Sequence, residues 1–249
     1  MSSRSPLDAE RVRRAVGTAW SRVDVVDETT STNADLAASA SRRADREVLV
    51  AERQTSGRGR LDRVWTSPPG AGLLFSMLLR PRAPMAQWGW LPLLAGVALA
   101  EGVERVAGIA CALKWPNDLL VGAQQRKAAG ILVQTAGDAV VIGIGLNVST
   151  TADELPVPTA TSLAVEGAPG LGREALLAAV LSQVDARLTA WDDASGDPTR
   201  SGLADAYRPR CATLGHQVRV TLTGGPPLVG EAVDLDGSGR LVLDVRGRT

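Results

Sequence analysis

The chain has 249 residues, 45% of them hydrophobic, so it can bury a core as one large domain or as a core domain with a small appendage. Its 27 basic and 27 acidic residues cancel at pH 7, which removes the bulk attraction that nucleic-acid-binding proteins use; we expect no nucleic-acid partner. Cys111 and Cys211 fit neither a disulfide framework nor a zinc-ligand spacing, so we expect reduced thiols in a cytoplasmic protein.

Apolar periodicity and helix-capping residues predict the elements of the first eighty residues. In chain order these are a helix over 8–16, a strand over 22–26, a helix over 33–41, and strands over 47–52 and 73–79. Residues 54–65 show no periodicity and carry two glycines and three arginines, so they predict a loop. The amino terminus is charged and lacks the apolar region of a secretory signal.

The middle of the chain predicts a buried helix and several short strands. The helix covers most of 84–106 and includes the longest apolar stretch, which Pro92 interrupts and Glu101 closes. That stretch is shorter than the roughly 20 residues that span a bilayer, so we predict a core helix and no membrane partner. The later elements are strands over 112–115, 119–121, 127–134 and 139–148, a polar loop over 149–162, and helices over 172–191 and 199–207.

After residue 215 the pattern changes to brief β segments over 217–222, 228–234 and 240–245. We predict a larger domain over 1–209 and a small β-barrel-like domain over 210–249. The last strand of the small domain reaches the end of the chain, so an incomplete domain stays open. Because helices and mainly antiparallel strands do not alternate regularly, the predicted fold class is α+β rather than a doubly wound sheet.

Only two of the 27 basic residues are lysines, Lys114 and Lys127. Arginine is a wide planar fork, whereas lysine is a compact point charge that can enter a narrow site. A general bias toward arginine explains the surface, but the two lysines lie close together in adjoining strand-like segments. We therefore expect at least one of them to be functional.

Several conventional sites are missing from the sequence. The single histidine, His216, lies in the terminal β region, where we expect a structural or exposed role. Without a second histidine or paired cysteines, a transition-metal site is not expected. No Walker-type or dinucleotide-binding glycine motif occurs in a strand–loop–helix context, so we expect any nucleotide to be bound by a different kind of motif.

Residues 54–65 contain the first candidate site. The glycines of Gly57-Arg58-Gly59-Arg60 let backbone amides approach an anion, and the arginines can make charge-assisted contacts with phosphate or carboxylate. Short arginine–glycine runs are also common solvated loops. Trp65, just beyond, could stack on a base as a lid, or could simply anchor the next strand.

A second cluster is Lys114-Trp115-Pro116-Asn117-Asp118. Pro116 fixes an extended segment, from which an amide and a carboxylate could hold a base edge, a Mg²⁺ ion or a nucleophile's proton. An ordinary Asn-Asp turn between strands is the alternative.

Two further features complete the candidates. Lys127 opens a strand, with Gly130 three residues later. Gly143 and Gly145 indicate close backbone approach in the last strand of the larger domain, to a ligand or to a neighbouring strand. The segment Ser31-Thr32-Asn33 offers two hydroxyls and an amide at a loop–helix junction, which helix capping alone also explains.

Taken together, these segments resemble the biotin–protein ligase family across nearly the whole chain. The matching stretches are Ser31-Thr32-Asn33; Gln54-Thr55-Ser56-Gly57-Arg58-Gly59-Arg60 with Trp65; Lys114-Trp115-Pro116-Asn117-Asp118; Arg126-Lys127-Ala128-Ala129-Gly130-Ile131-Leu132-Val133; and Gly143-Ile144-Gly145-Leu146-Asn147-Val148. Their joint order and spacing are specific, although none is decisive alone. The resemblance implies an α+β catalytic domain related to class II aminoacyl-tRNA synthetases and a carboxy-terminal SH3-like β-barrel.

The resemblance also implies roles for individual residues. Biotin contacts would fall on Ser31, Thr32, Asn33, Gln54, Arg58, Gly59, Arg60 and Lys127. Nucleotide contacts would fall on Arg58, Arg60, Trp65, Lys114, Asn117 and Asn147. Catalysis would depend on Lys127, Arg58, Arg60 and Asp118, with Asp118 also a possible Mg²⁺ ligand.

The implied activity is ATP- and Mg²⁺-dependent activation of biotin to biotinyl-5'-AMP. Biotin is then transferred to a lysine of the biotin carboxyl carrier protein of acetyl-CoA carboxylase or a related acyl-CoA carboxylase. A monomer and a homodimer both stay open.

This chain departs from the family pattern at Leu61-Asp62, where family loops often continue with a further glycine. Asp62 adds a carboxylate beside the phosphate-binding arginines. No helix-turn-helix segment precedes the catalytic region, which favours the single-function type over the dual ligase–repressor type. Two alternatives stay open: a lipoate or octanoate ligase or transferase of the same superfamily, and a non-catalytic, biotin-responsive regulator.

Overall fold

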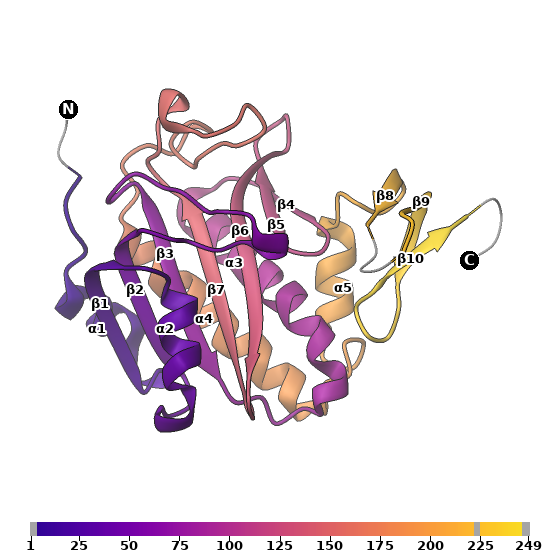
Figure 1. Ribbon diagram of the computed structural model, residues 1–249, viewed down its shortest axis with the longest axis horizontal. Helices are drawn as coiled ribbons and strands as arrows, with labels where there is room; N and C mark the ends of the chain where they lie inside the picture. Colours follow the sequence, from indigo (N-terminus) through magenta and orange to yellow (C-terminus); the bar gives the residue numbers. More distant parts are fainter. Residues whose placement is uncertain (1–3, 222–224, 246–249) are drawn as a thin grey trace.

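The computed structural model describes residues 4–221 and 225–245, without the side chain of Asp62. Its strands are β1 (Arg22–Thr29), β2 (Glu47–Gln54), β3 (Gly72–Leu79), β4 (Cys111–Lys114), β5 (Asp118–Val121), β6 (Arg126–Ala136), β7 (Ala139–Asn147), β8 (Gln217–Val220), β9 (Leu228–Leu235) and β10 (Leu241–Asp244). A seven-stranded sheet has the order β1-β2-β3-β7-β6-β5-β4, and a three-stranded sheet has the order β10-β9-β8 (Figure 1). β1 and β2 run parallel and the other neighbours antiparallel, which confirms a mixed, mainly antiparallel α+β fold.

Helices cover both faces of the large sheet. The α-helices are α1 (Ala9–Val16), α2 (Thr32–Ser39), α3 (Leu91–Ala107), α4 (Arg173–Asp193) and α5 (Leu203–Tyr207). Short 3-10 turns cover Gly17–Ala19, Ala40–Arg42, Arg60–Asp62, Met85–Trp90, Ala152–Glu154 and Arg208–Arg210. α2 lies in front of the sheet in the view of Figure 1, and α3 and α4 lie behind it. The α2 face carries the small apolar cluster and the opposite face the large one.

The predicted core helix begins later than expected: Met85–Trp90 forms a 3-10 turn, and α3 follows from Leu91. α3 presents buried residues all around, and Gly102 lets it approach α4 so closely that an added Cβ would lie 2.7 Å from the Val180 side chain. Such all-round burial is typical of a helix inside a globular core. Within the described ranges, no helix combines the length and hydropathy that crossing a bilayer requires.

β3 shows how the sheet separates its two faces, because successive side chains of a strand point to opposite sides. Phe75 and Met77 belong to the large core with α3 and α4, whereas Leu78 packs in the small cluster with α2. Ser76 shares the α2 face with Leu78 and is fully buried. A single hydroxyl in an otherwise apolar strand therefore lies under α2, where it needs hydrogen-bond partners.

Two tryptophans fasten the smaller sheet to the main body. Nε1 of Trp90 donates to the carbonyl of Gly237 and Nε1 of Trp115 donates to that of Gly239, both at 3.0 Å. The described residues form an open three-stranded sheet here, and Leu222, the predicted end of its first strand, lies outside them.

A second helix, α5, also begins later than predicted. The helix predicted from residue 199 starts at Leu203, because the carboxylate of Asp197 accepts from the backbone N–H groups of Thr199 and Arg200 and forms a separate turn. Gly202 then takes a left-handed conformation, with φ +71°, between the turn and the helix.

The cysteines are free, as expected. Cys111 and Cys211 are both buried thiols. Burial, with the nearby Glu104 carboxylate, raises the pKa of the Cys111 thiol to about 12, so it is protonated and unreactive at neutral pH.

Candidate active site

A cluster of buried and half-buried polar side chains, called the polar pocket below, lies on the α2 face. It consists of Thr32 and Asn33 at the start of α2 together with Gln54 on β2, Ser76 on β3 and Gln134 on β6. Ser31 is the N-cap of α2, so the helix begins with its backbone donors pointing to this place. Thr32, Asn33 and Ser76 are at most 4% exposed, which requires their polar atoms to be paired.

Hydrogen bonds fix the orientation of both amides in the polar pocket. The backbone N–H of Thr32 donates to Oε1 of Gln54 at 2.8 Å, which leaves Nε2 of Gln54 as a donor without an acceptor among the described residues. Nδ2 of Asn33 donates to the carbonyl of Leu132 at 3.2 Å and to Oε1 of Gln134 at 3.0 Å. Oδ1 of Asn33 must therefore face Ser76.

The orientation of these amides fixes the direction of the hydroxyl hydrogen bonds, because each hydroxyl can donate only one proton. Ser76 donates to Oδ1 of Asn33 at 2.5 Å, so its oxygen accepts from Oγ1 of Thr32 at 2.6 Å. The Thr32 hydroxyl then keeps a free lone pair. The polar pocket thus offers a ligand one acceptor, Oγ1 of Thr32, and one donor, Nε2 of Gln54.

Two glycines on β7 leave room for side chains of the site. An added Cβ at Gly143 would overlap Oδ1 of Asn33, and one at Gly145 would lie 2.5 Å from Nε1 of Trp65. The close approach at these glycines is made by side chains, those of Asn33 and Trp65, rather than by a neighbouring strand. Gly143 and Gly145 point to the same face about 7 Å apart, so the polar pocket and the Trp65 ring are adjacent along the strand.

A charged centre lies beside Trp65. Nζ of Lys127 lies 2.7 Å from Oδ1 of Asp118, at angles that do not make a hydrogen bond, and 5.6 Å from the centroid of the Trp65 ring. Gly130 pairs with Asp118 on one side and Gly145 on the other. The Lys127 and Asp118 side chains are 34% and 20% exposed, so a ligand can reach both.

The arginine–glycine loop (residues 57–65) folds back on itself beside this centre. The N–H of Trp65 donates to the carbonyl of Gly57 at 2.9 Å, and that of Gly59 donates to the carbonyl of Arg63 at 2.7 Å. Gly57 has no room for a Cβ, which would overlap the Trp65 carbonyl. The loop prediction is confirmed, although residues Arg60–Asp62 form a 3-10 turn.

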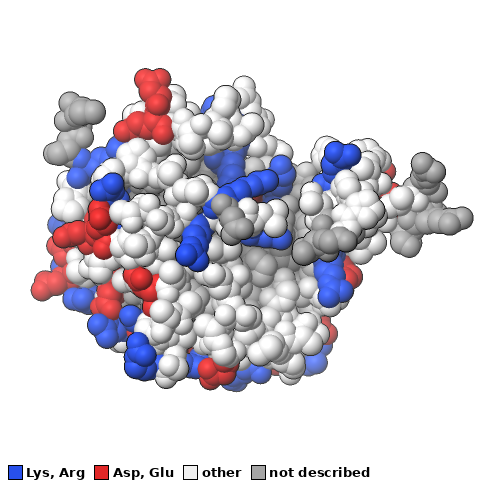
Figure 2. Space-filling model, in the orientation of Figure 1, with Lys and Arg blue, Asp and Glu red and all other residues white. Residues whose placement is uncertain are grey.

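The loop arginines are exposed, and Arg58, Arg60 and Arg63 form no ion pair with the residues that the structure describes. Figure 2 shows basic side chains gathered in the middle of this face, with few acidic ones beside them. Leu61 adopts the left-handed conformation, φ +55° and ψ +44°, which costs a non-glycine residue about 1–2 kcal/mol. The expected effect of Asp62 depends on a side chain outside the described set.

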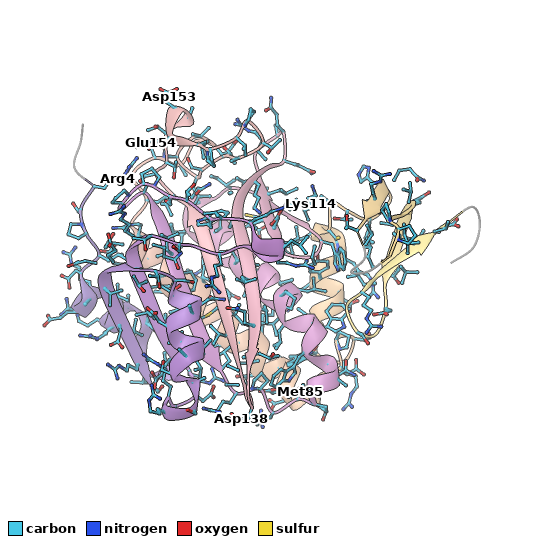
Figure 3. All side chains as sticks on the ribbon, in the orientation of Figure 1. Arg4, Met85, Lys114, Asp138, Asp153 and Glu154 are labelled. Carbon is cyan, nitrogen blue, oxygen red and sulfur yellow. The ribbon has the colours of Figure 1, made fainter. Side chains whose placement is uncertain are left out.

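The remaining predicted nucleotide residues lie on both sides of the charged centre. Lys114 ends β4 opposite Asp118 and is exposed (Figure 3). Nδ2 of Asn117 donates to the carbonyl of Ile131 at 2.9 Å, and Nδ2 of Asn147 donates to that of Thr161 at 3.0 Å. Each asparagine therefore also fixes a backbone segment, which leaves its Oδ1 for a ligand.

Sequence reasoning missed Ser76 and Gln134. A signal for Ser76 was present, because it is the single polar residue in the apolar strand Gly72–Leu79. Gln134 gave no comparable signal, since a glutamine near the end of an exposed-looking hairpin is ordinary. Its role depends on α2 lying over β6.

The charged centre has too few protein ligands to hold a magnesium ion by itself, so the phosphates of a nucleotide would have to supply the others. Among the described residues, no three His, Cys, Asp or Glu side chains are grouped so that they could hold a metal ion. Mg²⁺ is usually bound by one or two carboxylates plus substrate phosphates. Asp118 would be the protein ligand in that role, although its Oδ1 is paired with Nζ of Lys127 at 2.7 Å in this structure.

Known proteins share both the sequence and the fold of this chain. The Biotin/lipoate A/B protein ligase family matches residues 23–147, and the Biotin protein ligase C terminal domain matches residues 213–247. The biotin–[acetyl-CoA-carboxylase] ligase of Mycobacterium tuberculosis is 42% identical, over 99% of this chain and 93% of that protein. The bifunctional ligase/repressor BirA of Bacillus spizizenii is 33% identical, over 80% of this chain and 62% of its own length.

Solved structures agree. The biotin protein ligase of Aquifex aeolicus in complex with biotin and ATP has a TM-score of 0.75 at 30% identity, and the match covers 90% of this chain and 92% of that one. The chain therefore belongs to the Biotin/lipoate A/B protein ligase family and, within it, to the biotin–protein ligases.

Proposed function

We propose that this chain joins biotin to ATP as biotinyl-5'-AMP and then transfers the biotinyl group to a lysine of a carrier protein. The observation that carries this proposal is the placement of both parts on one sheet face: the polar pocket lies over Gly143, and the Trp65 ring beside the charged centre lies over Gly145, about 7 Å further along β7. This arrangement suits an acid with a polar ring at one end and a carboxylate several carbons away.

The polar pocket favours biotin over lipoate. A ureido ring can donate an N–H to Oγ1 of Thr32 and accept at its carbonyl from Nε2 of Gln54. A dithiolane ring has neither group and would leave both protein atoms buried and unpaired. Sites built to hydrogen-bond a substrate reject analogues without the matching groups by large factors.

In the first step a carboxylate oxygen of biotin attacks the α-phosphorus of ATP, and pyrophosphate leaves with the electrons of the broken P–O bond. Lys127, Arg58 and Arg60 offset the negative charge that gathers at that phosphorus. Mg²⁺, when bound with ATP at Asp118, supplies further charge neutralisation. Lys114, Asn117 and Asn147 hold the nucleotide, and Trp65 covers the adenine.

In the second step the carrier lysine attacks the acyl carbon, AMP leaves, and an amide forms. The free amine has a pKa of about 10.4 and must lose a proton, which Asp118 accepts. The arginine–glycine loop excludes water from the mixed anhydride, with Gly59 allowing its backbone to approach the ligand.

We further propose that residues 1–209 form a catalytic domain of the class II aminoacyl-tRNA synthetase type and that residues 210–249 form an SH3-like barrel. The carrier is the biotin carboxyl carrier domain of acetyl-CoA carboxylase or a related acyl-CoA carboxylase. The protein works in the cytoplasm, as a monomer or homodimer, without nucleic acid or membrane.

One assay tests the proposal. The purified chain is supplied with ATP, Mg²⁺, a carrier domain and either biotin or lipoate, and pyrophosphate release and carrier mass are followed. We expect acylation with biotin and none with lipoate. Acylation by lipoate alone would instead identify a lipoate ligase, and biotin binding without turnover would identify a regulator.

A further inference from the structure

The backbone of Lys127 pairs with β5 on one side and with a loop, not a strand, on the other. The last pair between β6 and β7 joins Ala129 to Leu146, so β7 does not reach Lys127. Beyond that pair, the N–H of Lys127 donates to the Thr159 carbonyl at 2.9 Å, and the N–H of Thr161 donates to the Lys127 carbonyl at 2.8 Å. The backbone that carries the ammonium group therefore depends on the position of segment 159–161.

The same loop, over residues 159–163, also holds Asn147 at the end of β7. Nδ2 of Asn147 donates to the Thr161 carbonyl at 3.0 Å, and the N–H of Leu163 donates to the Asn147 carbonyl at 3.1 Å. Thr161 is fully buried. One short loop segment thus sets the positions of the candidate lysine and a candidate nucleotide residue.

A single carboxylate fastens this segment to the strand that it supports. Oε1 of Glu166 accepts from the Thr161 hydroxyl at 2.6 Å and from Nη2 of Arg126, the residue before Lys127, at 2.7 Å. Its other oxygen lies against Gly122, where φ is +77° and an added Cβ would overlap the carboxylate. The Glu166 side chain is only 14% exposed, so solvent screens these charge-assisted bonds weakly.

We propose that Glu166 is a positioning residue for Lys127. It touches no reacting group. It bonds to the side chains of Arg126 and Thr161, one on each backbone segment beside the lysine, and so fixes where the ammonium meets the carboxylate and the α-phosphate. This inference rests on the proposed function. Displacements of about 1 Å at a reacting centre can cost on the order of 100-fold in rate. The polar pocket is built from α2, β2, β3 and the far part of β6, so it does not depend on Glu166.

The test measures biotin-dependent pyrophosphate release by the full chain. We expect Glu166→Ala to lower kcat by about 10- to 100-fold while the KM for biotin stays within about twofold. Glu166→Gln keeps an oxygen acceptor for Thr161 and Arg126 and should restore kcat to within about threefold of wild type. Glu154→Ala is the matched control, because this carboxylate of the same loop pairs with Arg4 (Figure 3) and bonds to neither Arg126 nor Thr161, so it should leave kcat unchanged.

A double variant asks whether Glu166 acts through the lysine. In a Lys127→Ala background and at saturating ATP, Glu166→Ala should lower the residual kcat no further, because the group that it positions is gone; loosening of Asn147 would raise the KM for ATP instead. If Glu166→Ala does not fold, Thr161→Val removes the partner hydroxyl at similar shape and decides instead, with an expected fall in kcat at unchanged KM.

The outcomes distinguish failure of the proposed function from failure of the positioning role of Glu166. An inactive wild-type chain would refute the proposed function. An active wild type with unchanged kcat in Glu166→Ala, or in Thr161→Val when the first variant is unfolded, would overturn the positioning role. A further loss in the Lys127→Ala background would overturn it too.

Discussion

The polar pocket and the arginine–glycine loop, two neighbouring parts of one candidate site, are built in opposite ways. In the polar pocket, Thr32, Asn33 and Ser76 are buried and hydrogen-bonded to one another before any ligand arrives. In the loop, Arg58 and Arg60 are exposed and form no ion pair with any described residue. Recognition of the acid is therefore preorganised, whereas the loop gains its partners only when an anion binds.

This contrast predicts separable effects. Changes in the polar pocket should alter both folding stability and biotin binding, because they disturb buried groups. Changes in the loop should alter chemistry or retention of the intermediate and leave stability intact. Lys127, between the two, should affect chemistry most.

Replacing Lys127 with alanine should have the largest effect on activity. The substitution removes the ammonium group expected at the reacting carboxylate and phosphate, and we expect biotin-dependent pyrophosphate release to fall by at least about 100-fold. The melting temperature should stay close to that of wild type, because the side chain is partly exposed. Near-normal pyrophosphate release would remove Lys127 from the mechanism.

Gly143→Ala should break the polar pocket itself. The added Cβ would overlap the Asn33 amide, and we expect a loss of about 1–3 kcal/mol in unfolding free energy from overpacking. Biotin affinity, measured by calorimetry, should fall by more than about tenfold because Asn33 no longer orients Ser76. Gly237→Ala, where no atom lies within 4 Å of the added Cβ, is the control. Equal behaviour of the two variants would contradict the close approach.

Ser76→Ala should act on recognition with little effect on chemistry. Without the serine, the Thr32 hydroxyl can turn toward Oε1 of Gln54, and we expect the KM for biotin to rise about 5- to 10-fold, equivalent to about 1 kcal/mol. The kcat for pyrophosphate release should change by less than about twofold. Ser201→Ala removes a hydroxyl that bonds to the Asp197 carbonyl away from the site and should leave KM unchanged. A fall in kcat at constant KM would argue against the relay of hydroxyls.

Arg58→Ala should have the smallest effect on the fold. Its side chain is exposed and without an ion-pair partner among the described residues, so unfolding free energy should change by less than about 0.5 kcal/mol. Retention of the adenylate should nevertheless weaken, measured as biotin label on a protein that is not the carrier. Arg219→Ala, an exposed arginine on β8, is the control. Leakage equal to that of wild type would refute the loop's role as a lid.

The sequence alone predicted most of the fold. The periodicity of the first strands and of α3 and α4 is strong, and these elements appear within a few residues of their predicted bounds, except that α3 begins at Leu91 after a 3-10 turn. The miss at residue 199 has a local cause that periodicity does not register, since the Asp197 side chain makes a turn of its own. The mixed sheet was expected as a class, but the order of its strands was not.

What the sequence determined about this protein is therefore the identity of its chemical groups: a serine–threonine–asparagine cap, an arginine–glycine loop, and two lysines among many arginines. Tertiary structure decided how those groups are oriented. Asn33 faces Ser76 because β6 offers its carbonyl acceptors on the other side, and Lys127 lies beside Asp118 because β5 and β6 pair in that register. Such orientations arise from contacts between residues far apart in the chain, and local sequence patterns do not encode them.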